Sequence, residues 1–230
     1  TAMTDQTDAS VAECLKSTDM IDADHPAIIE FSRRVVGGET DPKTKAIKLY
    51  YAVRDGFYYD PYGVRMTRDH FRASACLERK SGFCITKAGF LAAAARAVGV
   101  PARLGFADVR NHVSTKRMTE QMGTDVFHYH GFTELLIDGK WVKATPAFNI
   151  ELCDKFGILP LDFDGVNDSV FHPFTADGSR HMEYVMERGH RDDLPFDEIR
   201  DCFREKYPYM FDEETAIAGD FAAEAAAENA

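Results

Sequence analysis

The sequence is poor in the features that mark membrane-spanning and nucleic-acid-binding proteins. Its most apolar run, at 88–100, is interrupted by Arg96 and Gly99, so nothing approaches the roughly 18–20 consecutive apolar residues of a membrane-spanning helix. Positive charge is also scarce, because 27 Lys and Arg stand against 38 Asp and Glu, a net charge of −11. Such a balance repels a phosphate backbone. We therefore expect neither a membrane nor a nucleic acid as a partner.

Nothing in the cysteine pattern indicates disulfide bonds. The 5 cysteines are an odd number spread along 230 residues, and no Cys-x-x-Cys motif occurs. A chain of this length can bury a core without covalent cross-links, so we expect free thiols. Residues 1–4 lack the basic and apolar regions of a secretory signal, which predicts a cytoplasmic protein, although a signal removed ahead of them would leave no trace.

The composition that remains is that of an ordinary globular protein, with 45% hydrophobic and 28% charged residues. The sequence has no internal repeat and no low-complexity linker, which favours a single α+β domain over residues 1–230. The expected parts, in chain order, are a helical part at about 10–80, a core at about 80–150, a C-terminal extension at 151–212 and a flexible tail at 213–230.

Hydrophobic periodicity predicts helices ahead of the sheet. Apolar residues recur at helical intervals from residue 10 to about 57, interrupted by the helix-breaking stretch Gly37–Pro42. The strongest helical run follows at 84–98 and ends at a glycine, and its apolar composition predicts that it is buried.

Strands are expected in the middle of the chain, at 102–109, 126–137 and 140–145. The last two are joined by Asp138-Gly139, the signature of a two-residue type I′ hairpin. Three other segments carry weaker patterns: a solvated helix at 114–125, an edge strand at 181–185, and a solvated helix or disordered segment at 217–230. The fold that the motifs described below resemble implies a second interpretation of 114–125, as a border of the active-site cleft.

Cys84 is the first residue whose context suggests chemistry. It follows Ser81-Gly82-Phe83 and begins the strongest predicted helix, so its sulfur would lie beside free backbone N–H groups at the positive end of the helix dipole. Both effects lower the pKa of a thiol, and the same N–H groups can stabilise an oxyanion. The alternative is a cysteine that packs as a small apolar residue.

A cysteine nucleophile also needs an imidazole within hydrogen-bond reach. His128 and His130 are two residues apart in a predicted strand, so we expect them to share one face with Phe132 and Glu134. A His-x-His pair can equally bind a metal, but no further ligand occurs nearby at metal-site spacing. A surface or core histidine is the plain alternative for each of the two.

Taken in order, these segments resemble the transglutaminase-like superfamily. The residues that carry the resemblance are Ser81-Gly82-Phe83-Cys84, the run Phe90–Arg103, His130-Gly131-Phe132-Thr133-Glu134 and the stretch Gly139–Pro146. They follow that family's order of a cysteine at a helix start, Arg-Ala-x-Gly-x-Pro-Ala-Arg, His-x-Trp-x-Glu, and Trp followed by Asp-Pro. The match covers about residues 80–150, with weaker agreement at 41–62. It implies a papain-like core, a catalytic helix packed on an antiparallel sheet, and a Cys-His-Asp triad.

Carried over residue by residue, the resemblance makes Cys84 the nucleophile and His130, rather than His128, the general base. Glu134 becomes a supporting strand residue. The third triad position is occupied by Thr145, where the family has Asp. A hydroxyl can accept a hydrogen bond from the imidazole ring, but it adds no charge to stabilise an imidazolium.

Three other residues are alternatives for the third triad position: Asn149, Asp162 and Asp164. The resemblance implies acyl transfer through a thioester, with no cofactor and no metal. Hydrolysis is favoured over cross-linking, so we expect a cysteine protease or amidase acting on a peptide or protein amide. The main alternative is a catalytically inactive module of the same fold that binds a peptide or protein partner. A metal enzyme built on the two histidines is a third hypothesis, and the sequence carries no signal for oligomeric state.

Overall fold

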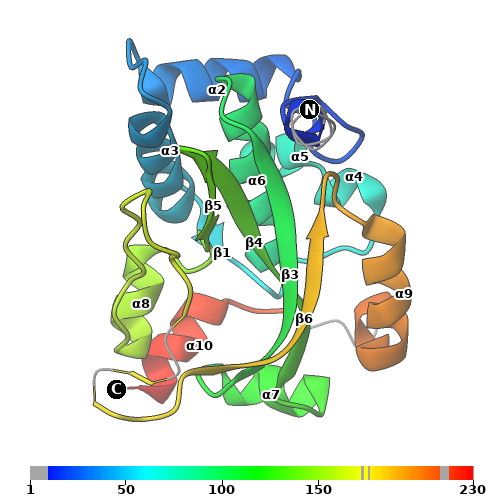
Figure 1. The fold of residues 1–230 in the computed structure, drawn as a ribbon. Helices are drawn as coiled ribbons and strands as arrows, with labels where there is room; N and C mark the ends of the chain where they lie inside the picture. The colour runs from blue at the N-terminus through cyan, green and yellow to red at the C-terminus, as the bar shows by residue number, and fades with distance from the viewer. Residues whose placement is uncertain (1–9, 172–173, 176, 213–217, 230) are drawn as a thin grey trace.

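The structure is a computed structural model that describes residues 10–171, 174–175, 177–212 and 218–229, and it is a mixed helix-and-sheet fold (Figure 1). Its helices are α2 (Pro26–Val36), α3 (Pro42–Gly56), α4 (Arg68–Phe71), α5 (Ala73–Arg79), α6 (Cys84–Ala97), α7 (Lys116–Met122), α8 (Ile150–Phe156), α9 (Phe196–Lys206), the 3-10 turn η1 (Pro208–Phe211) and α10 (Phe221–Glu228). Its strands are β1 (Tyr58–Tyr59), β2 (Ser81–Gly82), β3 (Ala102–Asn111), β4 (Val126–Ile137), β5 (Lys140–Ala144) and β6 (Met182–Arg191).

The main sheet is antiparallel and has the strand order β5-β4-β3-β6 (Figure 1). The predicted hairpin between β4 and β5 is confirmed, because Asp138 and Gly139 have φ values of 50° and 77°, as a type I′ turn requires. The predicted edge strand is also confirmed, and it is longer than expected because β6 pairs along most of β3. The α+β class with an antiparallel sheet is therefore correct.

Helix α6 lies at the centre of the molecule. It packs against β4 and β3 of the sheet and against α2, α3 and α5. Nearly all of its residues are buried, as predicted, and its run of alanines lets neighbouring elements approach closely. The two predicted N-terminal helices are confirmed as α2 and α3, and the Asp41 side chain accepts a hydrogen bond from the Thr44 amide at the start of α3.

A β-bulge breaks the regular alternation of β4. The pairing of β3 with β4 shifts between Ala107 and Val109, and Tyr129 has a φ of 55°, in the left-handed region. An extra residue on one strand reverses the side chains that follow it. The expectation that His128 and His130 share one face of the strand is therefore wrong.

The described residues near the end of the chain form helix α10, which buries Phe221 and Ala225. The Phe221 ring packs against Tyr59 and Phe156, so this segment covers more of the fold than a solvated helix would. Residues 213–217 and 230, which belong to the expected flexible tail, lie outside the described residues. No helix in the described part of the chain is long and apolar enough to cross a membrane.

Two arginines of the Arg-Ala-x-Gly-x-Pro-Ala-Arg segment hold the fold together. Arg96 donates hydrogen bonds to the carbonyl oxygens of Lys16, Ala102 and Asp192. Arg103 pairs with Glu134 on the neighbouring strand, and its guanidinium lies 4.1 Å from the centre of the Trp141 ring. All five cysteines are free thiols.

Candidate active site

Cys84 is the first residue of α6, and backbone amides surround its sulfur. The amides of Gly131, Ile85 and Cys84 itself lie close enough to Sγ to favour its negatively charged form. The start of the helix is fixed by the Thr86 hydroxyl, which accepts a hydrogen bond of 3.0 Å from the Phe83 amide. The predicted position at a helix start with free N–H groups is therefore confirmed.

The state of the thiol differs from the expectation drawn from sequence. Burial raises the pKa of Cys84 to about 11, although the three backbone amides act in the opposite direction. Only 7% of the residue is exposed to solvent, so the loss of hydration of a thiolate outweighs the favourable dipoles. A thiol with a pKa of about 11 is protonated and neutral at neutral pH.

His130 lies in β4 directly before Gly131, whose amide contacts the Cys84 sulfur. Its imidazole is buried and packs against Phe171, with ring centroids 5.8 Å apart. Burial, together with the nearby His181, lowers the pKa of His130 to about 4, so the ring is neutral at neutral pH. The backbone of His130 thus lies beside the thiol, but among the described residues no hydrogen bond joins Sγ to an imidazole nitrogen.

Thr145 follows β5 and is buried. Its Oγ1 and the Nε2 of His130 are both inaccessible to solvent, and neither has a hydrogen-bond partner among the described residues. The Thr145 carbonyl accepts a hydrogen bond of 3.2 Å from the Tyr50 hydroxyl, which fixes the backbone there. The two side chains that the resemblance places next to each other in a triad are therefore among the six described side chains that have a buried polar atom without a hydrogen-bond partner.

The three alternatives for the third triad position have other partners. The Asn149 side chain accepts a hydrogen bond of 3.0 Å from the Tyr59 amide. Asp162 is exposed and lies 3.6 Å from the Arg54 guanidinium. Asp164 accepts hydrogen bonds of 2.8 Å from two backbone amides of the turn that follows it. Each carboxylate or amide thus has a structural role of its own.

His128 has a carboxylate partner that the sequence patterns do not reveal. Its Nδ1 lies 2.9 Å from Asp108 Oδ2, and Arg188 binds the same carboxylate through a second bond of 2.8 Å. Asp108 also accepts a hydrogen bond from the Tyr129 amide, so it holds the bulge in place. Because Asp108 lies on β3 and Arg188 on β6, only the strand pairing brings them to His128.

A small cavity joins Cys84 to the region of His128. Its volume is about 40 Å³, close to the space of one water molecule. The lining is mostly apolar and aromatic: Tyr59, Pro61, Val64, Phe83, Cys84, Met118, Met122, Phe127, His128, Phe203, Tyr207, Tyr209 and Met210. Helix α7 supplies both Met118 and Met122 to this lining. The segment 114–125 therefore borders the cavity that contains Cys84, which is the interpretation of this segment as a border of the cleft.

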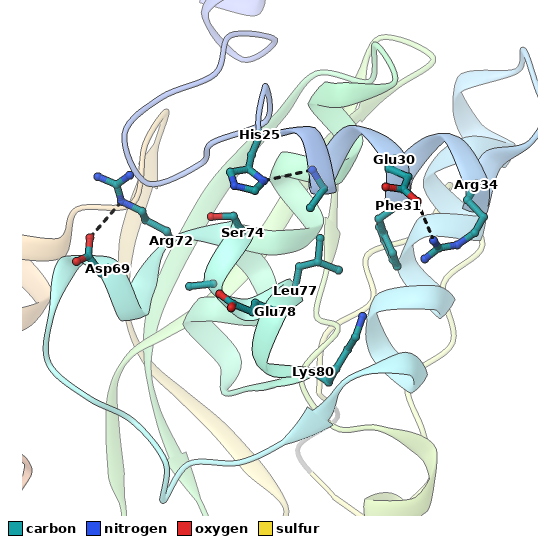
Figure 2. A pocket seen from close by; sticks show the side chains of 12 residues that line it. His25, Glu30, Phe31, Arg34, Asp69, Arg72, Ser74, Leu77, Glu78 and Lys80 are labelled. Atoms are coloured by element: carbon teal, nitrogen blue, oxygen red, sulfur yellow. Dashed lines mark hydrogen bonds and ion pairs between the residues drawn. The ribbon is translucent and has the colours of Figure 1, made fainter.

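A surface groove of about 570 Å³ lies elsewhere, between α2 and α5 (Figure 2). Its charged side chains neutralise each other, since Arg34 lies 4.0 Å from Glu30 and Arg72 lies 3.7 Å from Asp69. It contains none of the residues predicted to be catalytic. Within the described residues, no three side chains of His, Cys, Asp or Glu converge on a position that could hold a metal ion.

Comparison with known proteins identifies the family. The model of the transglutaminase-like superfamily matches residues 29–146, about half of the chain and the part that carries Cys84, His130 and Thr145. The chain therefore belongs to the transglutaminase-like superfamily, as the order of its motifs indicated. No curated protein matches the sequence at a significant level.

Two solved structures are similar in fold. A proposed cysteine protease from Cytophaga hutchinsonii superposes with a TM-score of 0.51 over 80% of this chain at 13% sequence identity, and this chain covers 47% of that protein. A proposed protease from Parabacteroides distasonis has a TM-score of 0.37 at 12% identity, covering 55% of this chain and 26% of that one. The first of these supports the fold, and this chain corresponds to about half the length of that neighbour.

Proposed function

We propose that this protein is a cysteine enzyme that cleaves an amide bond of a peptide or protein. The observation that carries the proposal is the environment of Cys84, whose sulfur lies at the start of α6 within reach of three backbone amides. A sulfur in that position can attack a carbonyl carbon while the same amides stabilise the oxygen that becomes negatively charged. A cysteine that only filled space would not need this arrangement.

The proposed reaction uses His130 to move one proton. The imidazole takes the proton of the Cys84 thiol as the sulfur attacks the amide carbon. The carbon–nitrogen bond then breaks, the imidazolium gives its proton to the departing amine, and a thioester remains on Cys84. A water molecule, deprotonated by the neutral imidazole, attacks the thioester and releases the carboxylic acid and the free thiol.

The protonation states are compatible with this sequence of steps. With a pKa of about 11 for Cys84 and about 4 for His130, both groups are neutral at neutral pH. The proton transfer then accompanies the attack, because no stable thiolate–imidazolium pair is present beforehand. An imidazole that is neutral above about pH 5 remains able to accept the proton at pH 6, where an isolated thiol with a pKa of about 11 is unreactive.

The rate of alkylation by iodoacetamide at Cys84, followed by mass spectrometry from pH 5 to pH 10, tests the proposal. We expect a rate that stays high down to about pH 6 in the parent protein and falls at least about tenfold in His130→Ala. His112→Ala is the matched control, because His112 pairs with Glu183 and does not contact Cys84. A rate that rises tenfold per pH unit up to pH 10 in all three proteins would contradict the proposal.

That opposite result would favour a catalytically inactive module that binds a peptide or protein partner. The observation in favour of this second candidate is Thr145, which gives His130 no charged partner. The cavity of about 40 Å³ at Cys84 is also too small for a substrate side chain unless its walls move. Removal of the thiol would then leave partner binding unchanged, whereas it abolishes an enzymatic activity.

A further inference from the structure

A second hollow adjoins the cavity of Cys84 and is rich in positive charge. It has a volume of about 400 Å³ and is lined by the loop before α4, by the end of α5 and by β2. Val64 and Phe83 line both this hollow and the cavity that contains Cys84, so the two spaces are neighbours. A substrate bound at the thiol would extend into or past this hollow.

Two guanidinium groups, those of Arg65 and Arg79, line the hollow. Neither makes an ion pair with a side chain in the described part of the protein. Arg79 is half-buried, and its Nη2 is inaccessible to solvent and has no hydrogen-bond partner among the described residues. Glu78, the residue before Arg79 in α5, acts on Arg79 electrostatically but makes no ion pair with it, and it lines the groove between α2 and α5 instead.

The remaining ionisable groups of the hollow do not cancel this charge. Asp60 is its one carboxylate, and the amides of Tyr62 and Gly63 already donate hydrogen bonds to its Oδ1. His70 is neutral, because burial and the two nearby arginines lower its pKa to about 4. At neutral pH the hollow therefore carries two positive charges and one negative charge.

Unpaired arginines are unexpected in this chain, whose net charge is −11. The neighbouring Arg68 and Arg72 both find a carboxylate, since each lies 2.8 Å from Asp19. A half-buried guanidinium without a partner is costly, and a carboxylate binds it through charge-assisted hydrogen bonds. The hollow thus has the charge and the free donors for an anion, directly beside the nucleophile.

We propose that this hollow is a substrate subsite that binds the side-chain carboxylate of a Glu or Asp residue near the cleaved amide, through Arg79 and Arg65. The inference rests on the proposed function, because it places the acidic residue in the same peptide that Cys84 attacks. It assigns the substrate class as an acidic peptide. The overall negative charge of the protein makes this local attraction more selective, since the rest of the surface repels acidic chains.

Tripeptide vinyl sulfones, which alkylate a cysteine, test the subsite. Glu is placed at each of the three positions in turn, and each compound has a counterpart with Gln. We expect the Glu compound to label Cys84 at least about tenfold faster than its Gln counterpart at one position, the usual strength of a charge-assisted hydrogen bond. Equal rates for Glu and Gln at all three positions, with rapid labelling by iodoacetamide, would overturn the subsite and leave the proposed function intact.

The variant Arg79→Gln should make the labelling rates of the Glu and Gln compounds equal, each rate being expressed relative to the iodoacetamide rate of the same variant. Arg65→Gln, at a more exposed position, should reduce the preference and is the second variant if Arg79→Gln fails to fold. Arg33→Gln is the matched control, because it removes one positive charge from α2, away from the hollow. A Glu preference that survives both hollow variants would also overturn the subsite.

Binding can be tested without any reaction, which separates the subsite from the enzymatic proposal. The variant Cys84→Ala is titrated with N-acetylglutamate amide, N-acetylglycine and N-acetylglutamine amide, and the Arg79 side-chain N–H signal is followed by NMR. A saturable shift with the glutamate amide alone supports the subsite even if iodoacetamide shows that Cys84 is unreactive. A shift with N-acetylglycine alone would indicate a terminal carboxylate and overturn the side-chain assignment, as would no shift with any of the three.

Discussion

The backbone amide of Gly131 lies beside the sulfur of Cys84 and favours its negatively charged form. This contact links the start of the central helix to the strand that carries His130, two segments separated by more than 40 positions in the sequence. The approach is close, since a side chain at Gly131 would place its Cβ 3.0 Å from the Cα of Ile85. The missing side chain is what lets β4 lie directly against the first turn of α6.

Replacement of Gly131 by alanine should therefore separate the strand from the helix. The added Cβ meets backbone atoms, which move less easily than a side chain, so we expect a loss of about 1–3 kcal/mol in the free energy of unfolding. We also expect slower alkylation of Cys84. Gly56→Ala is the control, because a Cβ there meets nothing within 4 Å. Equal unfolding free energies and alkylation rates for the two variants would show that the close approach is unimportant.

A carboxylate at position 145 should restore the charge that the family's triad has and this chain lacks. The variant Thr145→Asp should raise the pKa of His130 from about 4 by roughly 1–3 units, because a carboxylate stabilises the imidazolium. The pKa is measured by NMR titration of the His130 ring protons. Thr145→Asn, of similar size but neutral, should leave it low. An unchanged pKa in the Asp variant would mean that position 145 does not face the imidazole.

The burial of His130 should make the protein less stable in mild acid. Its pKa is about 4 when folded and about 6.5 when unfolded, so the unfolded chain binds more protons between these two values. The free energy of unfolding is therefore undiminished by this group above about pH 6.5 and decreases as the pH falls from 6.5 toward 4. His130→Asn should remove about 2 kcal/mol from the difference in unfolding free energy between pH 7 and pH 5, measured with denaturant. A pH dependence identical to that of the parent would show that the loss of stability in acid comes from the protonation of other groups, such as His70.

Most of the fold could be predicted because local patterns and tertiary packing agree. The type I′ turn at Asp138-Gly139, the helix start at Cys84 and the pairing of long apolar strands each depend on a few neighbouring residues. The order of the segments along the chain then indicated the family, because those that contain Cys84, His130 and Trp141 follow one another as they do in the transglutaminase-like superfamily. The candidate residues Cys84, His130 and Thr145, which these segments contain, could therefore be named from the sequence.

Other features of the site depend on contacts that no local pattern records. The bulge at Tyr129 separates His128 from His130, and Asp108 reaches His128 only through the pairing of β3 with β4. The neutral state of Cys84 follows from its burial, whereas the sequence shows only the helix start. Arg79 illustrates the same limit, because the lack of an ion-pair partner becomes visible only when the surrounding side chains are placed.

Lys87 is the clearest case of a residue whose role the sequence conceals. It is one turn into α6, fully buried, and its ammonium donates hydrogen bonds of 2.7–2.9 Å to the carbonyl oxygens of Arg54, Phe57 and Ala147. These three carbonyls belong to the end of α3, the residue before β1 and the loop after Thr145. A single side chain thus ties three segments around the site to the helix that begins with Cys84.

The variant Lys87→Met keeps most of the volume but leaves three buried carbonyls without their donor. Each unsatisfied group costs about 1–3 kcal/mol, so we expect the free energy of unfolding to fall by about 3 kcal/mol or more. Lys206→Met is the control, because that lysine is largely exposed and pairs only with the adjacent Glu205. Chemical denaturation at pH 7 measures both. Lys87 also holds the loop that follows Thr145, so the rate of alkylation of Cys84 should change in Lys87→Met and stay unchanged in Lys206→Met. A Lys87→Met variant as stable as the parent would show that the three carbonyl oxygens accept hydrogen bonds from water instead.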